Sequence, residues 1–253
     1  MTDLSGKVAL ITGAGQGIGQ GVALAMAGAG VTVAVTGRTL SKVETTAQMV
    51  RERGGKALAL ACDVKSADDL AAAVNATVAE FGGLDILVNN AQEVPLGTLD
   101  DVTDEAFTAG FESGPLATLR LMKLARPHLA ARGGGTIFNF CSSAGIRWDM
   151  TGYGAYAAVK QGIRSLTRAA AAEWGGEGIR VLTIAPHAES PGLKGWIEHN
   201  PEEAKAFFRT IPLGRVGSLE GDIGRALVAL CGQDLSYLTG ATIPLDGGQA
   251  NFD

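Results

Sequence analysis

The chain has few of the residues that mark several large classes of protein. Its 253 residues include only three cysteines, three histidines and 6% aromatic residues. Cys62, Cys141 and Cys231 are odd in number and far apart, which fits neither a disulfide framework nor the ligand spacing of a metal site. We therefore expect a protein of a reducing compartment, the cytoplasm, that holds no metal.

Positive charge and long apolar runs are scarce as well. The chain has 21 Lys and Arg against 26 Asp and Glu, a formal net charge of −5, and no basic stretch. A nucleic-acid partner is therefore not expected. No segment reaches the roughly 18 apolar residues of a membrane span. The segment after Met1 carries Asp3 and Lys7 instead of a signal peptide's apolar core, so a membrane partner is not expected either.

Glycine and apolar residues are abundant, with 36 glycines and 46% hydrophobic residues. Short apolar runs alternate with longer amphipathic stretches, which is typical of strands buried between two layers of helices. The predicted strands are Val8–Thr12, Val31–Thr36, Ala57–Ala61, Ile86–Val88, Thr136–Phe140, Val181–Ile184 and Thr242–Leu245, and the predicted helices are 18–29, 41–54, 67–81, 104–131, 154–175 and 221–231. This order predicts α/β architecture: one Rossmann-type domain over 1–253, a doubly wound parallel sheet of about seven strands.

One segment interrupts this alternation, at about residues 187–212. It carries Pro191, Gly192, Trp196 and Pro212. A long excursion at the ligand end of the sheet suggests a substrate lid. The alternative is a docking surface for another subunit.

The first predicted strand runs directly into a glycine-rich turn, Thr12-Gly-Ala-Gly-Gln-Gly-Ile-Gly19, and then into a helix. Glycines allow the backbone to approach a pyrophosphate, and the helix start offers free N–H groups. The spacing of Gly13, Gly17 and Gly19 differs from the strict dinucleotide fingerprint, so a plain tight turn is the alternative. The flanking strand and helix favour a dinucleotide site.

The second predicted strand ends at Gly37-Arg38, and no carboxylate lies between Val31 and Ser41. An NAD-selective site would use a carboxylate here to bind the ribose 2′-hydroxyl. Arg38 could instead pair with a 2′-phosphate, or it could be a solvated surface residue. The sequence thus favours NADP(H), with NAD(H) possible.

Polar residues also follow the third and fourth predicted strands. Asp63-Val64 could bind the adenine amino group through the carboxylate, or Asp63 could cap the next helix in competition with Ser66. Asn89-Asn90-Ala91 could line the ribose site or could simply tie neighbouring strands together.

Tyr156 and Lys160 lie four residues apart in a helical stretch, which places both side chains on one helix face. A nearby ammonium favours the phenolate, so we expect Lys160 to lower the Tyr156 pKa. The phenol can then exchange a proton with a carbonyl or alcohol oxygen while a hydride moves. A hydroxyl of Cys141-Ser142-Ser143 could hold the same oxygen.

These motifs, in this order, resemble those of the short-chain dehydrogenase/reductase family nearly end to end. Thr12–Gly19 resembles its TGxxxGxG turn, Asn89-Asn90-Ala91 its NNAG motif, and Asp246-Gly247-Gly248 part of its C-terminal third. The resemblance implies a Ser142-Tyr156-Lys160 catalytic set, although the commoner spacing would select Ser143. It also implies a homotetramer formed through helices 104–131 and 154–175. The implied cofactor residues are Gly13, Gln16, Gly17, Ile18, Gly19, Arg38, Asp63, Val64, Asn90, Ala91, Tyr156, Lys160 and Pro186.

The sequence departs from the family near the nicotinamide and the substrate. Gln92 stands where the family has the glycine of NNAG, and His187 stands where it has the glycine of a Pro-Gly pair. Gly114 replaces an Asn that is often placed in a proton relay, and Thr183 replaces another Asn. Pro115 inside a helix would free the Phe111 carbonyl to hold a relay water, or would merely kink the helix.

The expected substrate residues are partly aromatic and partly polar: Gln92, Ser143, Trp148, His187 and Trp196, with Phe207 or Phe208 nearby. Such a pocket suits an apolar or cyclic ketone or secondary alcohol. We therefore expect an NAD(P)-dependent oxidoreductase. The alternatives are dehydration or epimerisation on the same scaffold, and a non-catalytic cofactor-binding regulator.

Overall fold

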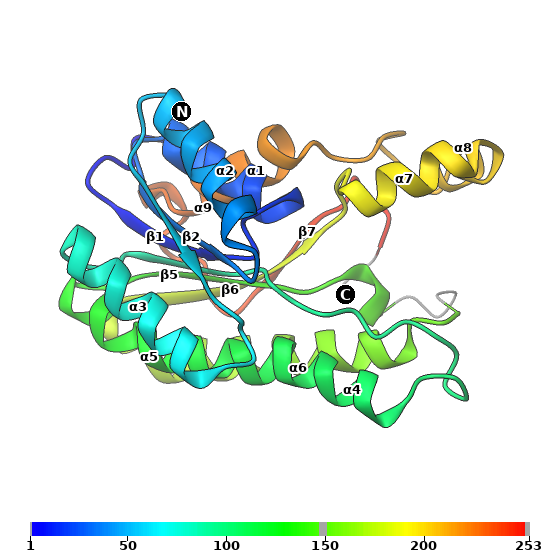
Figure 1. The fold of residues 1–253 in the computed structure, drawn as a ribbon, viewed down its shortest axis with the longest axis horizontal. Coiled ribbons are helices and arrows are strands. Elements are labelled where there is room, and N and C mark those ends of the chain that lie inside the picture. Colours follow the sequence, from blue (N-terminus) through cyan, green and yellow to red (C-terminus); the bar gives the residue numbers. More distant parts are fainter. Residues whose placement is uncertain (1, 147–150, 251–253) are drawn as a thin grey trace.

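The computed structural model describes residues 2–146 and 151–250. In this part of the chain one seven-stranded parallel sheet forms the centre, in the order β3-β2-β1-β4-β5-β6-β7 (Figure 1). The strands are β1 (Val8–Thr12), β2 (Thr32–Gly37), β3 (Ala57–Ala61), β4 (Ile86–Asn89), β5 (Gly135–Phe140), β6 (Ile179–Pro186) and β7 (Thr242–Leu245). The expected fold class is confirmed.

Strand order reverses beside β1, which pairs with β2 on one side and with β4 on the other. At such a reversal the connections leave toward opposite faces, and a crevice opens beyond the carboxyl ends of the strands. The glycine turn after β1 and the Asn89-Asn90-Ala91 segment after β4 therefore meet at one point.

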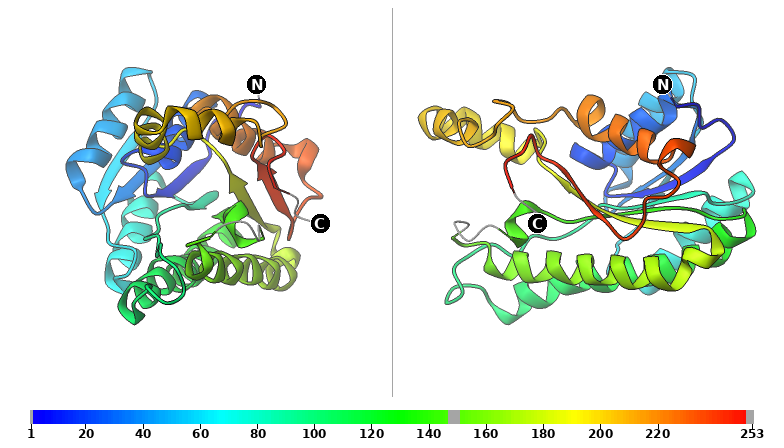
Figure 2. Two further views of the ribbon diagram at one scale, coloured as in Figure 1. Left: turned by 90° about the vertical axis from the view of Figure 1, so that its right-hand side faces the viewer. Right: turned by 180° about the vertical axis from the view of Figure 1, so that it is seen from behind.

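Helices cover both faces of the sheet (Figures 1 and 2). One layer contains α1 (Gly17–Gly28), α2 (Leu40–Glu52) and α9 (Arg225–Leu230), and the other contains α3 (Ala67–Phe81), α4 (Asp104–Phe111), α5 (Ala117–Ala131) and α6 (Gly154–Trp174). Short turns of 3-10 helix lie at η2 (Ser143–Gly145), η3 (Gly175–Glu177) and η5 (Gln233–Leu235). Two apolar clusters fill the spaces between the sheet and these layers, and the sheet is therefore buried on both faces.

Two of the expected helices contain a π-helical turn. The predicted helix 104–131 is interrupted by η1 (Glu112–Leu116), and the predicted helix 221–231 begins as η4 (Leu219–Gly224). Pro115 lies inside η1 and is buried. A proline lacks the N–H that an α-helical turn needs, and a wider turn accommodates that loss.

The segment 187–212 forms two short helices that the periodicity did not predict, α7 (Pro191–His199) and α8 (Pro201–Phe208). They project from the body of the molecule on the side of the strand ends (Figure 1). Each helix begins with a proline at its first position, where the missing N–H costs nothing, and Ser190 caps α7 by accepting from the Leu193 N–H. In the sequence, these helix starts are marked only by Ser190-Pro191 and Asn200-Pro201.

No helix in the described ranges is long and apolar enough to cross a membrane. Within the same ranges no group of three or more His, Cys, Asp or Glu side chains is arranged to hold a metal ion.

The start of α1 is positioned by unusually close packing between α1 and η4. A Cβ on Gly21 would lie 2.5 Å from the Leu219 carbonyl carbon, and a Cβ on Gly224 would lie 2.5 Å from the Ala25 Cβ. Real Cβ atoms do not approach backbone this closely, so both positions require glycine.

We predict that Gly21→Ala destabilises the protein by about 1–3 kcal/mol, because the added methyl must push η4 away. Gly28→Ala in the same helix is the matched control, since nothing lies within 4 Å of its Cβ position. The control should be neutral or stabilising by up to about 1 kcal/mol through better helix propensity. Thermal or urea unfolding measures both variants, and equal stability of the two would contradict the packing argument.

Candidate active site

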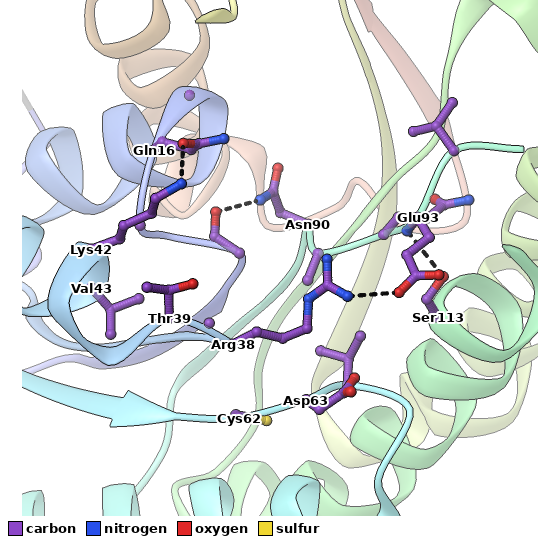
Figure 3. Close-up of a pocket in the computed structure, with 18 of the residues that line it drawn as sticks. Gln16, Arg38, Thr39, Lys42, Val43, Cys62, Asp63, Asn90, Glu93 and Ser113 are labelled. Carbon is purple, nitrogen blue, oxygen red and sulfur yellow. Dashed lines mark hydrogen bonds and ion pairs between the residues drawn. The ribbon is translucent and has the colours of Figure 1, made fainter. Parts of the chain in front are cut away.

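A cavity of about 490 Å³ opens at the strand ends where the order reverses (Figure 3). This volume is in the range of small-molecule sites. Its lining includes eight of the expected cofactor residues: Gly13, Gln16, Gly17, Arg38, Asp63, Val64, Asn90 and Ala91. Ile18, Gly19, Pro186, Tyr156 and Lys160 lie outside this lining. The expected substrate residue Gln92 also lines the cavity. The other lining residues were not among the expected site residues: Gly15, Gly37, Thr39, Lys42, Val43, Cys62, Glu93, Val94, Ser113, Ser190 and Pro191.

The glycine turn has the conformation that a phosphate-binding turn requires. Gly13 has a φ of 65°, and a Cβ there would lie 2.8 Å from the Asn90 side-chain nitrogen. Gly17, with a φ of 60°, begins α1, and the Gln16 side chain does not cap the helix. The first N–H groups of a helix have no partner within the helix, so this uncapped end fits a pyrophosphate.

The two asparagines after β4 both tie structural elements together. Asn90 Nδ2 donates to the carbonyl oxygen of Thr12 at 2.9 Å and so holds the glycine turn. Asn89 Nδ2 donates to Asn139 Oδ1 at 2.7 Å, and Asn139 Nδ2 donates to Thr167 Oγ1 at 2.9 Å. This buried chain of polar groups connects β4, β5 and α6. Asn89 therefore ties neighbouring strands together, as one of the two interpretations held. Asn90 holds the glycine turn and also lines the cavity.

Asp63 is not the cap of the helix that follows it. Ser66 caps α3 by accepting from the Asp69 N–H at 3.2 Å. The Asp63 carboxylate accepts from the Lys65 N–H at 3.0 Å and lies in the cavity wall (Figure 3). This placement leaves carboxylate lone pairs for a ligand in the cavity.

Arg38 lies at the far end of the cavity and forms an ion pair that the sequence did not suggest. Its Nη1 lies 2.8 Å from Glu93 Oε1, and Lys65 Nζ lies 3.1 Å from the same oxygen (Figure 3 shows the first pair). Lys42 Nζ donates to Gln16 Oε1 at 3.3 Å. Arg38 and Lys42 therefore both line the cavity, and Lys65 pairs with the carboxylate that Arg38 contacts.

Lys160 fixes α6 against the end of β5. Its side chain is buried, and Nζ donates to the carbonyl oxygen of Phe140 at 2.8 Å. Burial penalises the charged form and lowers the pKa of Lys160 to about 8. The Nζ atom lies 5.4 Å from the centre of the Tyr156 ring. The two residues of the Tyr/Lys pair are thus in contact.

The Tyr156 phenol forms a hydrogen bond with the side chain of Ser142. Burial of the phenol raises the pKa of Tyr156 to about 12, although the Ser142 bond lowers it. The expectation that Lys160 would bring this pKa below its ordinary value is therefore wrong. Desolvation of the phenolate is the largest cause of this shift. The Tyr156 phenol is therefore protonated at neutral pH.

Gln92 and Gly114, two of the departures from the family pattern, are neighbours. A Cβ on Gly114 would lie 3.1 Å from Gln92 Nε2 and 2.7 Å from Val159 Cγ1. The Gln92 side chain therefore occupies the space that an asparagine at 114 would need. Its Nε2 atom is buried and has no hydrogen-bond partner among the described residues. The hypothesis that Pro115 frees a carbonyl for a relay water stays a prediction.

His187 and Trp196 meet through the aromatic ring of Phe207. The ring centres lie 5.2 Å apart for His187 and Phe207 and 5.6 Å apart for Trp196 and Phe207, both in edge-to-face geometry. The backbone N–H of His187 donates to the backbone carbonyl oxygen of Leu245 at 2.9 Å. Ser143 begins η2 beside the Ser142 hydroxyl. Trp148 lies outside the described residues.

Comparison with known proteins agrees with this geometry. A family model described as enoyl-(acyl carrier protein) reductase matches residues 13–250. A 12alpha-hydroxysteroid dehydrogenase of Clostridium sp. is 40% identical, covering 96% of each chain. A D-threitol dehydrogenase of Mycolicibacterium smegmatis is 33% identical, covering 97% of this chain and 93% of the relative.

A solved structure of a 7α-hydroxysteroid dehydrogenase, complexed with NADH and 7-oxo glycochenodeoxycholic acid, superposes with a TM-score of 0.91. It is 31% identical and covers 98% of this chain and 96% of its own. The relatives named here are oxidoreductases of alcohol and ketone substrates, and this one binds a nicotinamide cofactor. With its parallel sheet, glycine turn and Ser-Tyr-Lys geometry, the chain belongs to the short-chain dehydrogenase/reductase family of oxidoreductases.

Proposed function

We propose that the protein is an NADP(H)-dependent oxidoreductase that interconverts a carbonyl group and a secondary alcohol on an apolar or cyclic substrate. The observation that carries this proposal is the contact between three groups at the end of β5. The Ser142 hydroxyl bonds the Tyr156 phenol, and the Lys160 ammonium lies over the phenol ring. This arrangement supports the assignment of Tyr156 as proton donor and of Ser142 as hydrogen-bond donor to one carbonyl oxygen.

In the proposed reaction the nicotinamide dinucleotide supplies or accepts the hydride. Tyr156 gives its proton to the carbonyl oxygen during reduction and takes it back during oxidation. Ser142 orients the same oxygen through a hydrogen bond. Lys160, held by the Phe140 carbonyl, favours the phenolate that remains after proton transfer and could bind the nicotinamide ribose.

The cavity residues fit the rest of the dinucleotide. The N–H groups at the start of α1, behind Gly13 and Gly17, fit the pyrophosphate. The Asp63 carboxylate fits the adenine amino group, and Ala91 leaves room for a ribose. Arg38, preceded by Gly37 and not by a carboxylate, fits a 2′-phosphate, and this supports NADP(H) over NAD(H).

The expected substrate wall supports an apolar substrate. The rings of His187, Trp196 and Phe207 form one cluster, and Ser143 and Gln92 have polar side chains. Two relatives act on hydroxysteroids, which are apolar and cyclic, whereas a third acts on the polyol D-threitol. A screen of hydroxysteroids, cyclic ketones and polyols with NADPH and NADH tests the proposal. Preference for cyclic ketones or steroids supports it, and preference for polyols contradicts it.

The outer face of α4, α5 and α6 supports the proposal of a homotetramer. An apolar groove there is lined mainly by Phe107, Phe111, Pro115, Leu116 and Leu119. Leu116 is 37% exposed and Phe107 is 41% exposed. Exposed apolar area of this kind is typical of subunit interfaces.

We predict that Tyr156→Phe lowers kcat by about 10²- to 10⁴-fold while NADPH still binds, because the proton donor alone is removed. Ser142→Ala should also impair turnover, whereas Ser143→Ala should retain most of it. Steady-state kinetics and NADPH fluorescence separate catalysis from binding. Full activity in Ser142→Ala together with loss in Ser143→Ala would show that the wrong serine is assigned.

The pKa of about 8 for Lys160 predicts the pH dependence of carbonyl reduction. Below this pH the Lys160 ammonium is charged, and it stabilises the Tyr156 phenolate that remains once the phenol has given up its proton. Above this pH the charge of Lys160 is lost. We therefore expect kcat/KM for the carbonyl to fall as pH rises through about 8. In Lys160→Met the residual activity should lack this inflection. A flat wild-type profile from pH 6 to 10 would contradict the assignment.

We predict that wild-type protein has a solution mass near four times 25.9 kDa and that Leu116→Glu has a smaller one. A charge buried in an apolar interface without a partner is costly. Leu235→Glu is the matched control, since Leu235 is also 37% exposed but lies in η5. Light scattering measures the masses. A tetrameric Leu116→Glu, or dissociation by Leu235→Glu alone, would place the interface elsewhere.

A further inference from the structure

Glu93 brings a carboxylate to the place where the sequence after β2 provides none. β2 ends at Gly37, Arg38 follows it, and neither residue has an acidic neighbour in the sequence. The Glu93 side chain contacts Arg38 from the segment after β4. Its Oε1 lies 2.8 Å from Arg38 Nη1 (Figure 3). The cation that fits a 2′-phosphate is therefore already paired with an anion of the protein.

The backbone of Glu93 is held in place by a buried serine. The Glu93 N–H donates to Ser113 Oγ at 3.0 Å, and Ser113 Oγ donates to the carbonyl oxygen of Ala109 at 2.7 Å. Ser113 is 2% exposed. The carboxylate thus extends from a fixed point on the cavity wall and is not a freely moving surface charge.

Lys65 provides Glu93 with a second cation. Lys65 Nζ lies 3.1 Å from the same Oε1, and the Lys65 carbonyl oxygen accepts from Arg120 at 3.1 Å. The Arg38 side chain is 64% exposed, whereas those of Glu93 and Lys65 are each 31% exposed. Arg38 is therefore the partner that can leave, and Glu93 keeps Lys65 when it does.

We infer that Glu93 is a specificity-determining residue that competes with the cofactor's 2′-phosphate for Arg38 and so narrows the preference for NADP(H) over NAD(H). This inference rests on the proposed role of Arg38. A 2′-phosphate must draw the guanidinium away from Glu93, and that exchange costs part of the binding energy. A cofactor without the phosphate leaves the Arg38–Glu93 pair intact.

The decisive substitution is Glu93→Gln, which keeps the side-chain shape and the backbone bond to Ser113. An ion pair as exposed as this one contributes up to about 1 kcal/mol, so freeing Arg38 should tighten 2′-phosphate binding about two- to fivefold. The probes are adenosine 2′,5′-bisphosphate and 5′-AMP, which differ only in the 2′-phosphate. Calorimetric titration of each, at low ionic strength, measures their affinity ratio without any turnover.

The matched control is Glu44→Gln. Glu44 also lies 2.8 Å from an arginine Nη1, that of Arg51, and its substitution changes the net charge equally, but it lies outside the cavity lining. We expect Glu93→Gln to raise the bisphosphate-to-AMP affinity ratio two- to fivefold and Glu44→Gln to leave it unchanged. An unchanged ratio in Glu93→Gln, or an equal rise in both variants, would overturn the inference.

Arg38→Gln distinguishes this inference from the proposed cofactor choice. If Arg38→Gln leaves the affinity ratio at the wild-type value, Arg38 does not bind the phosphate and the NADP(H) proposal fails. If Arg38→Gln lowers the ratio and Glu93→Gln does not raise it, only the role of Glu93 fails. In the Arg38→Gln background, Glu93→Gln should have no further effect. A rise there would mean that Glu93 repels the phosphate directly, which contradicts competition for Arg38.

Discussion

The site depends on one buried interaction, the hydrogen bond from the Lys160 ammonium to the Phe140 carbonyl oxygen. A lysine that is 4% exposed must have a strong acceptor, and Phe140 is the last residue of β5. The bond fixes α6 against the strand end. Tyr156, one helical turn earlier, is then placed beside Ser142, which follows the strand by two residues. The position of the phenol follows from this contact.

Burial that positions the pair also sets its protonation. The same desolvation that lowers the Lys160 pKa to about 8 raises the Tyr156 pKa to about 12. The phenol is therefore protonated at neutral pH, as the proposed transfer of a proton to a carbonyl oxygen requires. In the cavity wall, Arg38 is likewise paired with a group of the protein, because its Nη1 lies 2.8 Å from Glu93 Oε1.

Much of the fold could be predicted, because strands that are buried on both faces appear in the sequence as short apolar runs. Three strands, β1, β3 and β7, have the predicted bounds. The glycine turn and the Tyr/Lys spacing were also visible, since they are local in sequence. Helices α7 and α8 escaped the periodicity because they are short, although Pro191 and Pro201 marked their starts. The Arg38–Glu93 pair could not be predicted, because its partners are 55 residues apart and meet only through the sheet order.

Two of the departures from the family pattern, at Gln92 and Gly114, have a physical explanation that the sequence alone could not supply. Gln92 and Gly114 are 22 positions apart in the chain, yet the side chain of one fills the space left by the other. The change at 114 is thus matched by the change at 92, and the Gln92 Nε2 atom is buried and unpaired among the described residues.

The central claim is that a hydride moves between the cofactor and a carbonyl carbon of the substrate. The most direct measurement is isotope transfer from NADPH that carries deuterium at the reactive nicotinamide carbon, with mass spectrometry of the alcohol product. We expect one deuterium on the new carbinol carbon, and about 10²- to 10⁴-fold slower transfer with the Tyr156→Phe variant. An alcohol formed without deuterium, from either stereoisomer of the labelled cofactor, would contradict it.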